Sequence, residues 1–242
     1  MNSASSRPKI GAHVSSSGGV HTAIDRAIGM GAEAIQLFSG APYAWKRKNY
    51  TQAEVDTYKK RVDETGVEPA FIHGLYLVNL ASTDEALLAR SYDALVAEMK
   101  AASLIGAKGV IFHLGSHKGA GYEACFTQVV EYVQKVVENT PNDAWLILEN
   151  SAGMGGAIGS KFAELGTIIR EAGSERVKVC IDTQHAFAAG NDVKTRPGLD
   201  KMIEEFDRDV GLERWVAIHA NDSKCPLGGG IDRHGRHNFG VT

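Results

Sequence analysis

The sequence predicts an α/β fold of the TIM (β/α)8-type barrel class. Strand-like apolar runs alternate with helix-like segments along the whole chain, and five of these runs end in a histidine or an acidic residue. Those five ends lie 33 to 40 residues apart. A barrel of roughly 250 residues with eight units uses about 31 residues per unit, so each interval fits one strand and one helix.

The elements are expected in regular order. The predicted strands cover 9–14, 34–38, 70–74, 109–113, 145–150, 177–182 and 216–222, and the predicted helices cover 20–30, 52–65, 84–105, 122–139, 160–172 and 199–210. The strands are almost continuously apolar, which is typical of a parallel sheet buried on both faces.

An eighth strand is missing from this pattern. After the seventh strand the sequence is rich in glycine, histidine and charge, up to Thr242. We therefore expect a single barrel domain over 1–242 that lacks its last β/α unit and leaves two unpaired strand edges. Either the sequence is a piece of a longer protein or something else covers the gap. Residues 1–8 are expected to be a frayed terminus.

Composition limits the class of protein. The 242 residues are 43% hydrophobic and 23% charged, which suits one globular α/β domain. A net charge of −3 excludes a globally basic nucleic-acid coat but allows a local phosphate-binding patch. Three scattered cysteines and the lack of a signal peptide or membrane-length apolar run favour a cytoplasmic protein without a membrane partner. We expect a monomer.

The strand ends carry the candidate chemistry. The carboxyl ends of barrel strands converge on one rim, and a buried carboxylate there needs a compensating cation. The ligand-type residues at these ends are His73, His113, Glu149, Asp182 and His219.

Two local pairs enlarge this set, namely Asp182 with His185 and Asp232 with His234. Eight ligands exceed the needs of one tetrahedral ion, so two or three ions are expected, with Glu149 placed to bridge. Carboxylates and imidazoles without thiolate favour Zn²⁺, with Mn²⁺ or Fe²⁺ as alternatives. Clustered divalent ions are suited to phosphoryl displacement.

Motifs spread along the chain resemble the endonuclease IV family, whose members are deoxyribonucleases that cut DNA at apurinic/apyrimidinic sites. In order they are GAHVSSSGG, HGLYLVNLAS, FHLGSH, LENSAG, CIDTQHAFAAG, HANDSK and DRH, from about Lys9 to His234. The combination of LEN, IDTxHAF and NDSK is specific. The resemblance implies a TIM barrel with three zinc ions.

The resemblance also implies roles for the eight ligands. His73 and His113 would hold one zinc, which shares Glu149, the expected catalytic residue, with a second. Asp182 and His219 would hold that second ion together with one further acid, and the third ion would be held by His185, Asp232 and His234. The expected reaction in base excision repair is attack of hydroxide on the phosphate 5′ to the abasic sugar in double-stranded DNA, which leaves a 3′-hydroxyl.

Candidate DNA contacts follow from the same comparison. Tyr76 matches the family tyrosine that enters DNA near the lesion, and Tyr43 stands where the family has a DNA-inserting arginine. Lys224, in NDSK, contacts phosphate or is simply solvated. The sequence also departs from the family at Met154, where Gln is common, and it lacks the family's last zinc ligand, a Glu on the eighth strand.

Two other functions remain open. Sugar isomerases and epimerases of the xylose-isomerase-like barrels also place histidines and acids on strand ends, usually with one or two metals. A catalytically impaired binder of damaged DNA is the second alternative, because one ligand is missing. A metal count separates the first from a nuclease, and cleavage of an abasic oligonucleotide separates the second.

Overall fold

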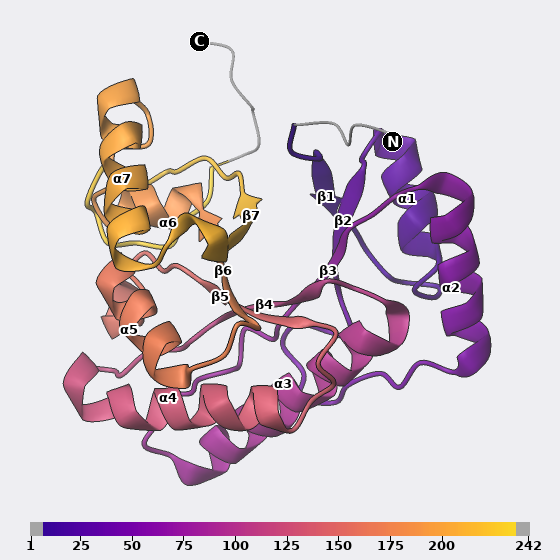
Figure 1. Cartoon of the computed structure of the whole chain (residues 1–242), viewed down its shortest axis with the longest axis horizontal. Helices are drawn as coiled ribbons and strands as arrows, with labels where there is room; N and C mark the ends of the chain where they lie inside the picture. Colours follow the sequence, from indigo (N-terminus) through magenta and orange to yellow (C-terminus); the bar gives the residue numbers. More distant parts are fainter. Residues whose placement is uncertain (1–6, 236–242) are drawn as a thin grey trace.

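Seven parallel strands form one curled sheet in chain order in the computed structural model of the protein, which describes residues 7–235 (Figure 1). They are β1 (Gly11–His13), β2 (Ala34–Phe38), β3 (Ala70–His73), β4 (Gly109–His113), β5 (Trp145–Glu149), β6 (Val177–Asp182) and β7 (Trp215–His219). Every neighbouring pair is parallel. The predicted barrel class is confirmed, as are all seven predicted strands.

The helices lie on the outside of the curled sheet (Figure 1). They are α1 (Thr22–Met30), α2 (Gln52–Thr65), α3 (Glu85–Ile105), α4 (Tyr122–Glu138), α5 (Phe162–Ala172), α6 (Thr183–Ala188) and α7 (Arg196–Asp209), with short 3₁₀ turns η1 (Met154–Gly156) and η2 (Leu212–Arg214). The short helix α6 and both 3₁₀ turns were not predicted from the sequence.

Helix α7 begins three residues earlier than the predicted start at residue 199. The segment TRPG was expected from the sequence to precede the helix. Thr195 instead caps the helix by accepting a hydrogen bond from the backbone N–H of Gly198, and Pro197 occupies the first turn. Proline is tolerated there because the N–H groups of a first turn have no partner within the helix.

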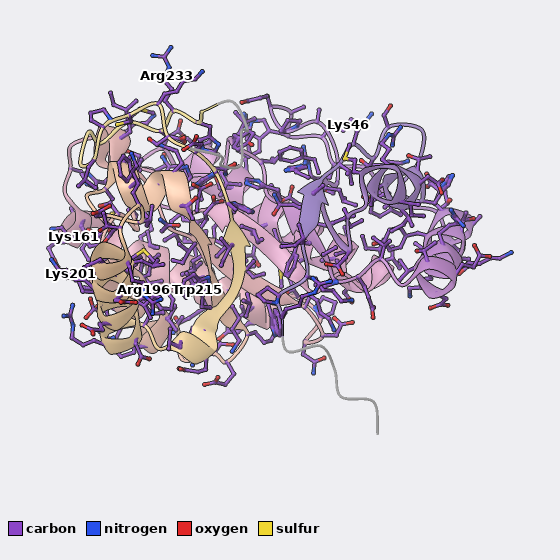
Figure 2. The ribbon with its side chains drawn as sticks, turned by 90° about the horizontal axis from the view of Figure 1, so that it is seen from above. Lys46, Lys161, Arg196, Lys201, Trp215 and Arg233 are labelled. Carbon is purple, nitrogen blue, oxygen red and sulfur yellow. The ribbon has the colours of Figure 1, made fainter. Side chains whose placement is uncertain are left out.

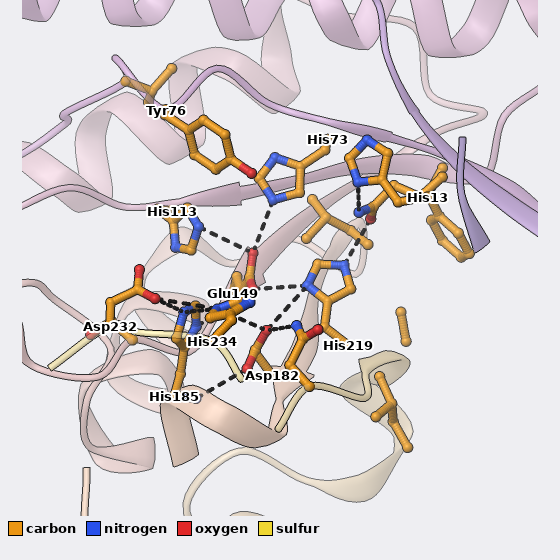
Figure 3. Close-up of a pocket in the computed structure, with 18 of the residues that line it drawn as sticks. His13, His73, Tyr76, His113, Glu149, Asp182, His185, His219, Asp232 and His234 are labelled. Atoms are coloured by element: carbon orange, nitrogen blue, oxygen red, sulfur yellow. Dashed lines mark hydrogen bonds and ion pairs between the residues drawn. The ribbon is translucent and has the colours of Figure 1, made fainter. Parts of the chain in front are cut away.

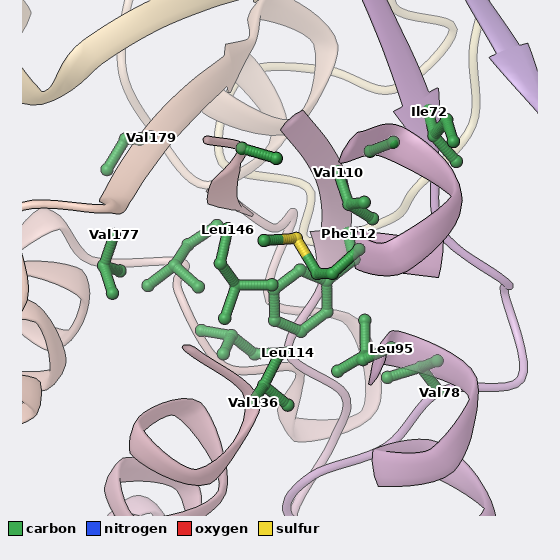
Figure 4. Close-up of a cluster of buried hydrophobic side chains, with 14 of the residues drawn as sticks. Ile72, Val78, Leu95, Val110, Phe112, Leu114, Val136, Leu146, Val177 and Val179 are labelled. Carbon is green, nitrogen blue, oxygen red and sulfur yellow. The ribbon is translucent and has the colours of Figure 1, made fainter. Parts of the chain in front are cut away.

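The main hydrophobic core lies between the sheet and the helices. Outward-facing side chains such as Phe112 and Leu146 pack against Leu95 of α3 and Val136 of α4 (Figure 4). Phe112 is fully buried, and truncating such a residue to alanine costs about 3–5 kcal/mol. This layer therefore provides much of the energy that holds the strands in place.

A second, smaller cluster faces the barrel interior. It contains Ile111, Ile147 and Cys180, with Phe71 and Ala217 packed against it. Side chains alternate between the two faces of a strand, so residues two positions further along point the same way. The last residues of β3 to β7 lie two positions beyond these five, and they therefore also face inward.

The two edges of the sheet are β1 and β7. Within residues 7–235, β1 pairs only with β2, β7 pairs only with β6, and no eighth strand is present. At the start of the described chain, Arg7 pairs with Glu33 at 2.6 Å, and residues 1–6 lie outside the described part. No helix of the described chain has the length and apolar character needed to cross a bilayer.

Candidate metal centre and DNA-binding rim

The register of the strands brings the candidate ligands at the ends of β3 to β7 to one place. In neighbouring strands His113 lies opposite Glu149, and Asp182 lies opposite His219. His73 ends β3 on the same inward face. These side chains converge inside the carboxyl end of the sheet (Figure 3), within a cleft of about 2210 Å³.

The first ligand set is His73, His113 and Glu149. The Nε2 atoms of the two histidines lie 3.4 and 3.5 Å from Oε2 of Glu149. Nδ1 of His73 lies 2.8 Å from the carbonyl oxygen of Gly74. A carbonyl only accepts, so Nδ1 carries a hydrogen, and Nε2 is the nitrogen that faces the carboxylate of Glu149.

The second set is Glu149, Asp182 and His219. Nδ1 of His219 lies 2.8 Å from Oε1 of Glu149 and 3.9 Å from Oδ2 of Asp182. The side-chain amide of Asn221 donates to the same Asp182 oxygen at 2.5 Å. Nε2 of His219 lies 2.8 Å from Oε1 of Gln36, so the imidazole is held from both sides.

The third set combines α6 with the last loop. Nε2 of His185 and Nε2 of His234 lie 3.3 and 3.2 Å from Oδ1 of Asp232. His234 also approaches Asp182 at 4.0 Å, and an antiparallel bridge between Ser223 and His234 holds the loop there. Asp182 caps α6 by accepting from the backbone N–H of His185, which fixes the spacing of this pair.

The three sets share their acids. One ligand atom per residue lies within 4.8 Å of the others in His73–His113–Glu149, in Glu149–Asp182–His219 and in Asp182–His185–His234. In the last of these groups the acid beside His185 and His234 is Asp182 rather than Asp232. Among the described residues, Oε2 of Glu149 is buried and has no hydrogen-bond partner. A buried carboxylate oxygen without a partner is costly, and a bound cation removes that cost. The nitrogen and oxygen donors therefore fit divalent metal ions.

Charge coupling within the cluster shifts several pKa values. Burial favours neutral imidazole at His219 and His185, but the neighbouring carboxylates raise their pKa values to about 12 and about 9. Burial alone would raise the pKa of Glu149, but His113 and His219 hold it well below its usual value. Burial also lowers the pKa of His113. Binding of a metal ion by His185 and His219 would therefore displace protons from both imidazoles.

An aromatic rim stands over this cluster. Tyr76 and Tyr43 are 45% and 73% exposed, and their ring centroids are 5.2 Å apart. Tyr76 also lies 5.2 Å from the ring of His73 and 6.2 Å from that of His113. Burial raises the pKa of Tyr76 to about 12, so its hydroxyl stays protonated and can donate a hydrogen bond.

Basic side chains also lie at this end of the molecule. Lys224 is exposed, and its backbone N–H donates to the carbonyl of Arg233 at 3.0 Å. Figure 2 shows Arg233 and Lys46 at the edge toward which the strands point, whereas Trp215 lies at the opposite end of β7. Sequence analysis missed Arg233, although its place between Asp232 and His234 predicts an outward side chain.

Sequence analysis also missed Gln36. Its amide nitrogen lies 3.1 Å from Nδ1 of His13 and its amide oxygen contacts His219, so it links β1, β2 and β7. The available signal was a polar residue inside the apolar run AIQLF. His13 lies 6.0 Å from the ring of His73, next to the first ligand set.

The fold and the strand-end ligands together define a xylose isomerase-like TIM barrel, and a sequence profile of that class matches residues 24–242. A protein of Cenarchaeum symbiosum (strain A) named "Probable endonuclease 4" is 39% identical over 229 residues, which are 93% of this chain and 81% of that protein. The chain belongs to the endonuclease IV family.

Solved structures agree with this assignment. The crystal structure of endonuclease IV from Thermus thermophilus superposes with a TM-score of 0.86 at 34% identity, over 96% of this chain and 83% of that chain. A D-tagatose 3-epimerase-like protein matches with a TM-score of 0.66 at 18% identity, over 89% of this chain and 76% of that one. The second likeness shows a shared fold only.

Proposed function

We propose that this chain is an endonuclease of base excision repair that hydrolyses the phosphodiester 5′ to apurinic/apyrimidinic sites in double-stranded DNA. The observation that carries this proposal is the set of three adjoining ligand groups beneath an exposed pair of tyrosines. Membership of the endonuclease IV family supports it. The acting form that we propose is a cytoplasmic monomer.

The cofactor that we propose is three zinc ions, with Mn²⁺ or Fe²⁺ as alternatives. One site would use His73 and His113, a second Asp182 and His219, with Glu149 shared between them. The third site would use His185, Asp232 and His234. When bound, such ions supply hydroxide near neutral pH and neutralise charge that develops on the phosphate.

The protein residues would bind and orient the DNA. Tyr76 and Tyr43 would enter the duplex at the lesion, where a missing base leaves space and little stacking is lost. The exposed Lys224 and Arg233 would contact backbone phosphates, which position the duplex without reading its sequence. Glu149 and Asp182, buried below them, keep the ligand histidines in fixed orientations.

The sugar isomerase or epimerase alternative is less well supported. Likeness to the epimerase-like structure stops at the fold. The third ligand set and the exposed tyrosine pair have an evident use in DNA cleavage and none in the isomerisation of a small sugar. The alternative of an impaired DNA binder depends on whether the described ligands are sufficient for catalysis.

An end-labelled duplex with one abasic site tests the proposal. We expect the zinc-loaded chain to cut 5′ to the site, to leave an undamaged duplex of the same sequence intact, and to lose activity on chelation. Binding without cleavage would favour the impaired binder. Neither binding nor cleavage, together with a single metal per chain, would favour the isomerase class.

A further inference from the structure

A buried ion pair lies beneath the loop that carries Tyr43. Nη1 of Arg47, in the loop between β2 and α2, lies 3.0 Å from Oε1 of Glu98 in α3, with side chains 8% and 0% exposed. Nη2 of Arg47 also donates to the carbonyls of Ala41, at 2.8 Å, and Ala44. One guanidinium thus ties the backbone on both sides of Tyr43 to a helix of the core.

The same carboxylate lies beneath the loop that carries Tyr76. A Cβ added at Gly74 would lie 3.3 Å from Oε2 of Glu98 and 2.8 Å from Cβ of Phe112, so only glycine fits over it. The backbone N–H of Tyr76 donates to the carbonyl of Pro42 at 3.2 Å. Glu98 therefore lies under the loops that carry Tyr43 and Tyr76, and these two loops are also hydrogen-bonded to each other.

Stability alone does not account for this pair. A buried ion pair is often no more stabilising than apolar residues of the same volume, because both charges lose their hydration. Burial accordingly raises the pKa of Glu98 to about 7, against the opposing effect of Arg47. What an apolar pair cannot supply is a fixed donor for the carbonyls of Ala41 and Ala44.

We propose that Arg47 and Glu98 are positioning residues that hold Tyr43 and Tyr76 together as one preformed aromatic wedge for the lesion in DNA. This inference rests on the proposed function. The two rings are 5.2 Å apart with an interplanar angle of 36°, although Tyr43 is highly exposed. Because the two rings are already ordered in the free protein, no conformational entropy is lost in ordering them when DNA binds. Ordering of the rings therefore affects the affinity for DNA rather than the rate of the chemical step.

Arg47→Met is the first test, because methionine keeps a long side chain but donates no hydrogen bond. We expect Kd and KM for an abasic duplex to rise about 10-fold, as for partial loss of aromatic stacking, while kcat changes less than about twofold. Metal content should not change. Arg196→Met is the matched control, because Arg196 is exposed and pairs with Asp200 in α7 (Figure 2).

The double variant Arg47→Met/Glu98→Leu guards against simple misfolding. Removing both charges should recover folding stability but not duplex affinity, because the donor to Ala41 and Ala44 is still missing. In a Tyr43→Ala background, Arg47→Met should have an effect below about twofold, since residues that act as a unit are not additive. Wild-type affinity in the double variant, or a full effect without Tyr43, would overturn the proposal.

Limited trypsin digestion tests, without DNA, whether Arg47 and Glu98 hold the loop between β2 and α2 in place. The loop contains Lys46 and Lys48, and we expect it to be cut faster in Arg47→Met than in the unaltered chain or in Arg196→Met. If the unaltered chain does not bind abasic DNA at all, the proposed function fails. The digestion assay then remains as the test of whether Arg47 and Glu98 hold the loop. Equal cleavage of the loop in all three proteins would then overturn the positioning role of Arg47 and Glu98.

Discussion

Glu149 belongs to two of the three candidate ligand sets. It ends β5, its side chain is 2% exposed, and its two oxygens approach four histidines from four different elements. The eight proposed ligands could be located from the sequence because each ends an apolar strand or belongs to a short local motif. The support given by Gln36 was not, since one glutamine in a strand does not reveal its neighbours.

Glu149→Gln keeps the size of the side chain but removes the charge that two ligand sets share. We expect metal content to fall and abasic-site cleavage to drop by at least about 100-fold. Elemental analysis and initial rates measure both. Unchanged metal content and rate would show that Glu149 is not a ligand.

Asn150 fixes the backbone of Asp182, one of the proposed metal ligands, through two hydrogen bonds. Its side-chain oxygen accepts from the backbone N–H of Asp182 at 2.6 Å, and its amide donates to the carbonyl of Asp182 at 3.2 Å. Asn150→Ala should weaken metal affinity by about 10- to 100-fold, as measured by competition with a chelator. Asn139→Ala, at an exposed helix end, is the control and should leave metal affinity unaltered.

At the level of elements, the periodic sequence pattern predicted the strands well and the connections less well. The ends of β3 to β7 were evident because each of these five apolar runs stops at a histidine or an acidic residue. Helix α6 was missed because six residues are too few to show helical periodicity. The pairing of Arg47 with Glu98 spans 51 residues and joins an irregular loop to a helix, so no local signal reveals it.

A substitution at Gly109 tests whether the close approach of β4 and β5 is needed for stability. A Cβ at this position would collide with the carbonyl oxygen of Trp145 and lie 2.9 Å from Cδ1 of Ile147. Gly109→Ala should lower the free energy of unfolding by about 1–3 kcal/mol. Metal content should fall with it, because these strands deliver His113 and Glu149.

Gly29→Ala is the matched control for that prediction. Gly29 lies in α1, and among the described residues no atom lies within 4 Å of an added Cβ apart from its chain neighbours and the backbone of its own helix. This substitution should raise the free energy of unfolding by about 0.5–1 kcal/mol, because glycine is unfavourable inside a helix. Urea denaturation measures both variants, and equal effects would contradict the packing argument.

On the scale of the whole molecule, the centre links folding, protonation and metal binding. The pKa values of His185 and His219 are raised from 6.5 to about 9 and about 12 in the metal-free fold. A histidine with a raised pKa stabilises the fold fully below pH 6.5, and that contribution is lost as the pH rises through the folded value. Protons and metal ions compete for the same nitrogen atoms.

We therefore expect the free energy of unfolding of the metal-free protein to decrease between pH 6.5 and pH 9, the folded pKa of His185. The stabilisation gained on adding zinc should grow over the same range, because fewer protons must be displaced. Urea denaturation with and without zinc measures both. Metal-free stability that rises with pH would contradict the assigned charge states.

The most direct test of the account is to locate the metals by anomalous scattering at the zinc edge in a crystal of the zinc-loaded protein. We predict three peaks: one between His73 and His113, one between Asp182 and His219, and one among His185, Asp232 and His234. Glu149 should bridge the first two. A single peak, or first and second peaks that do not contact Glu149, would contradict the account.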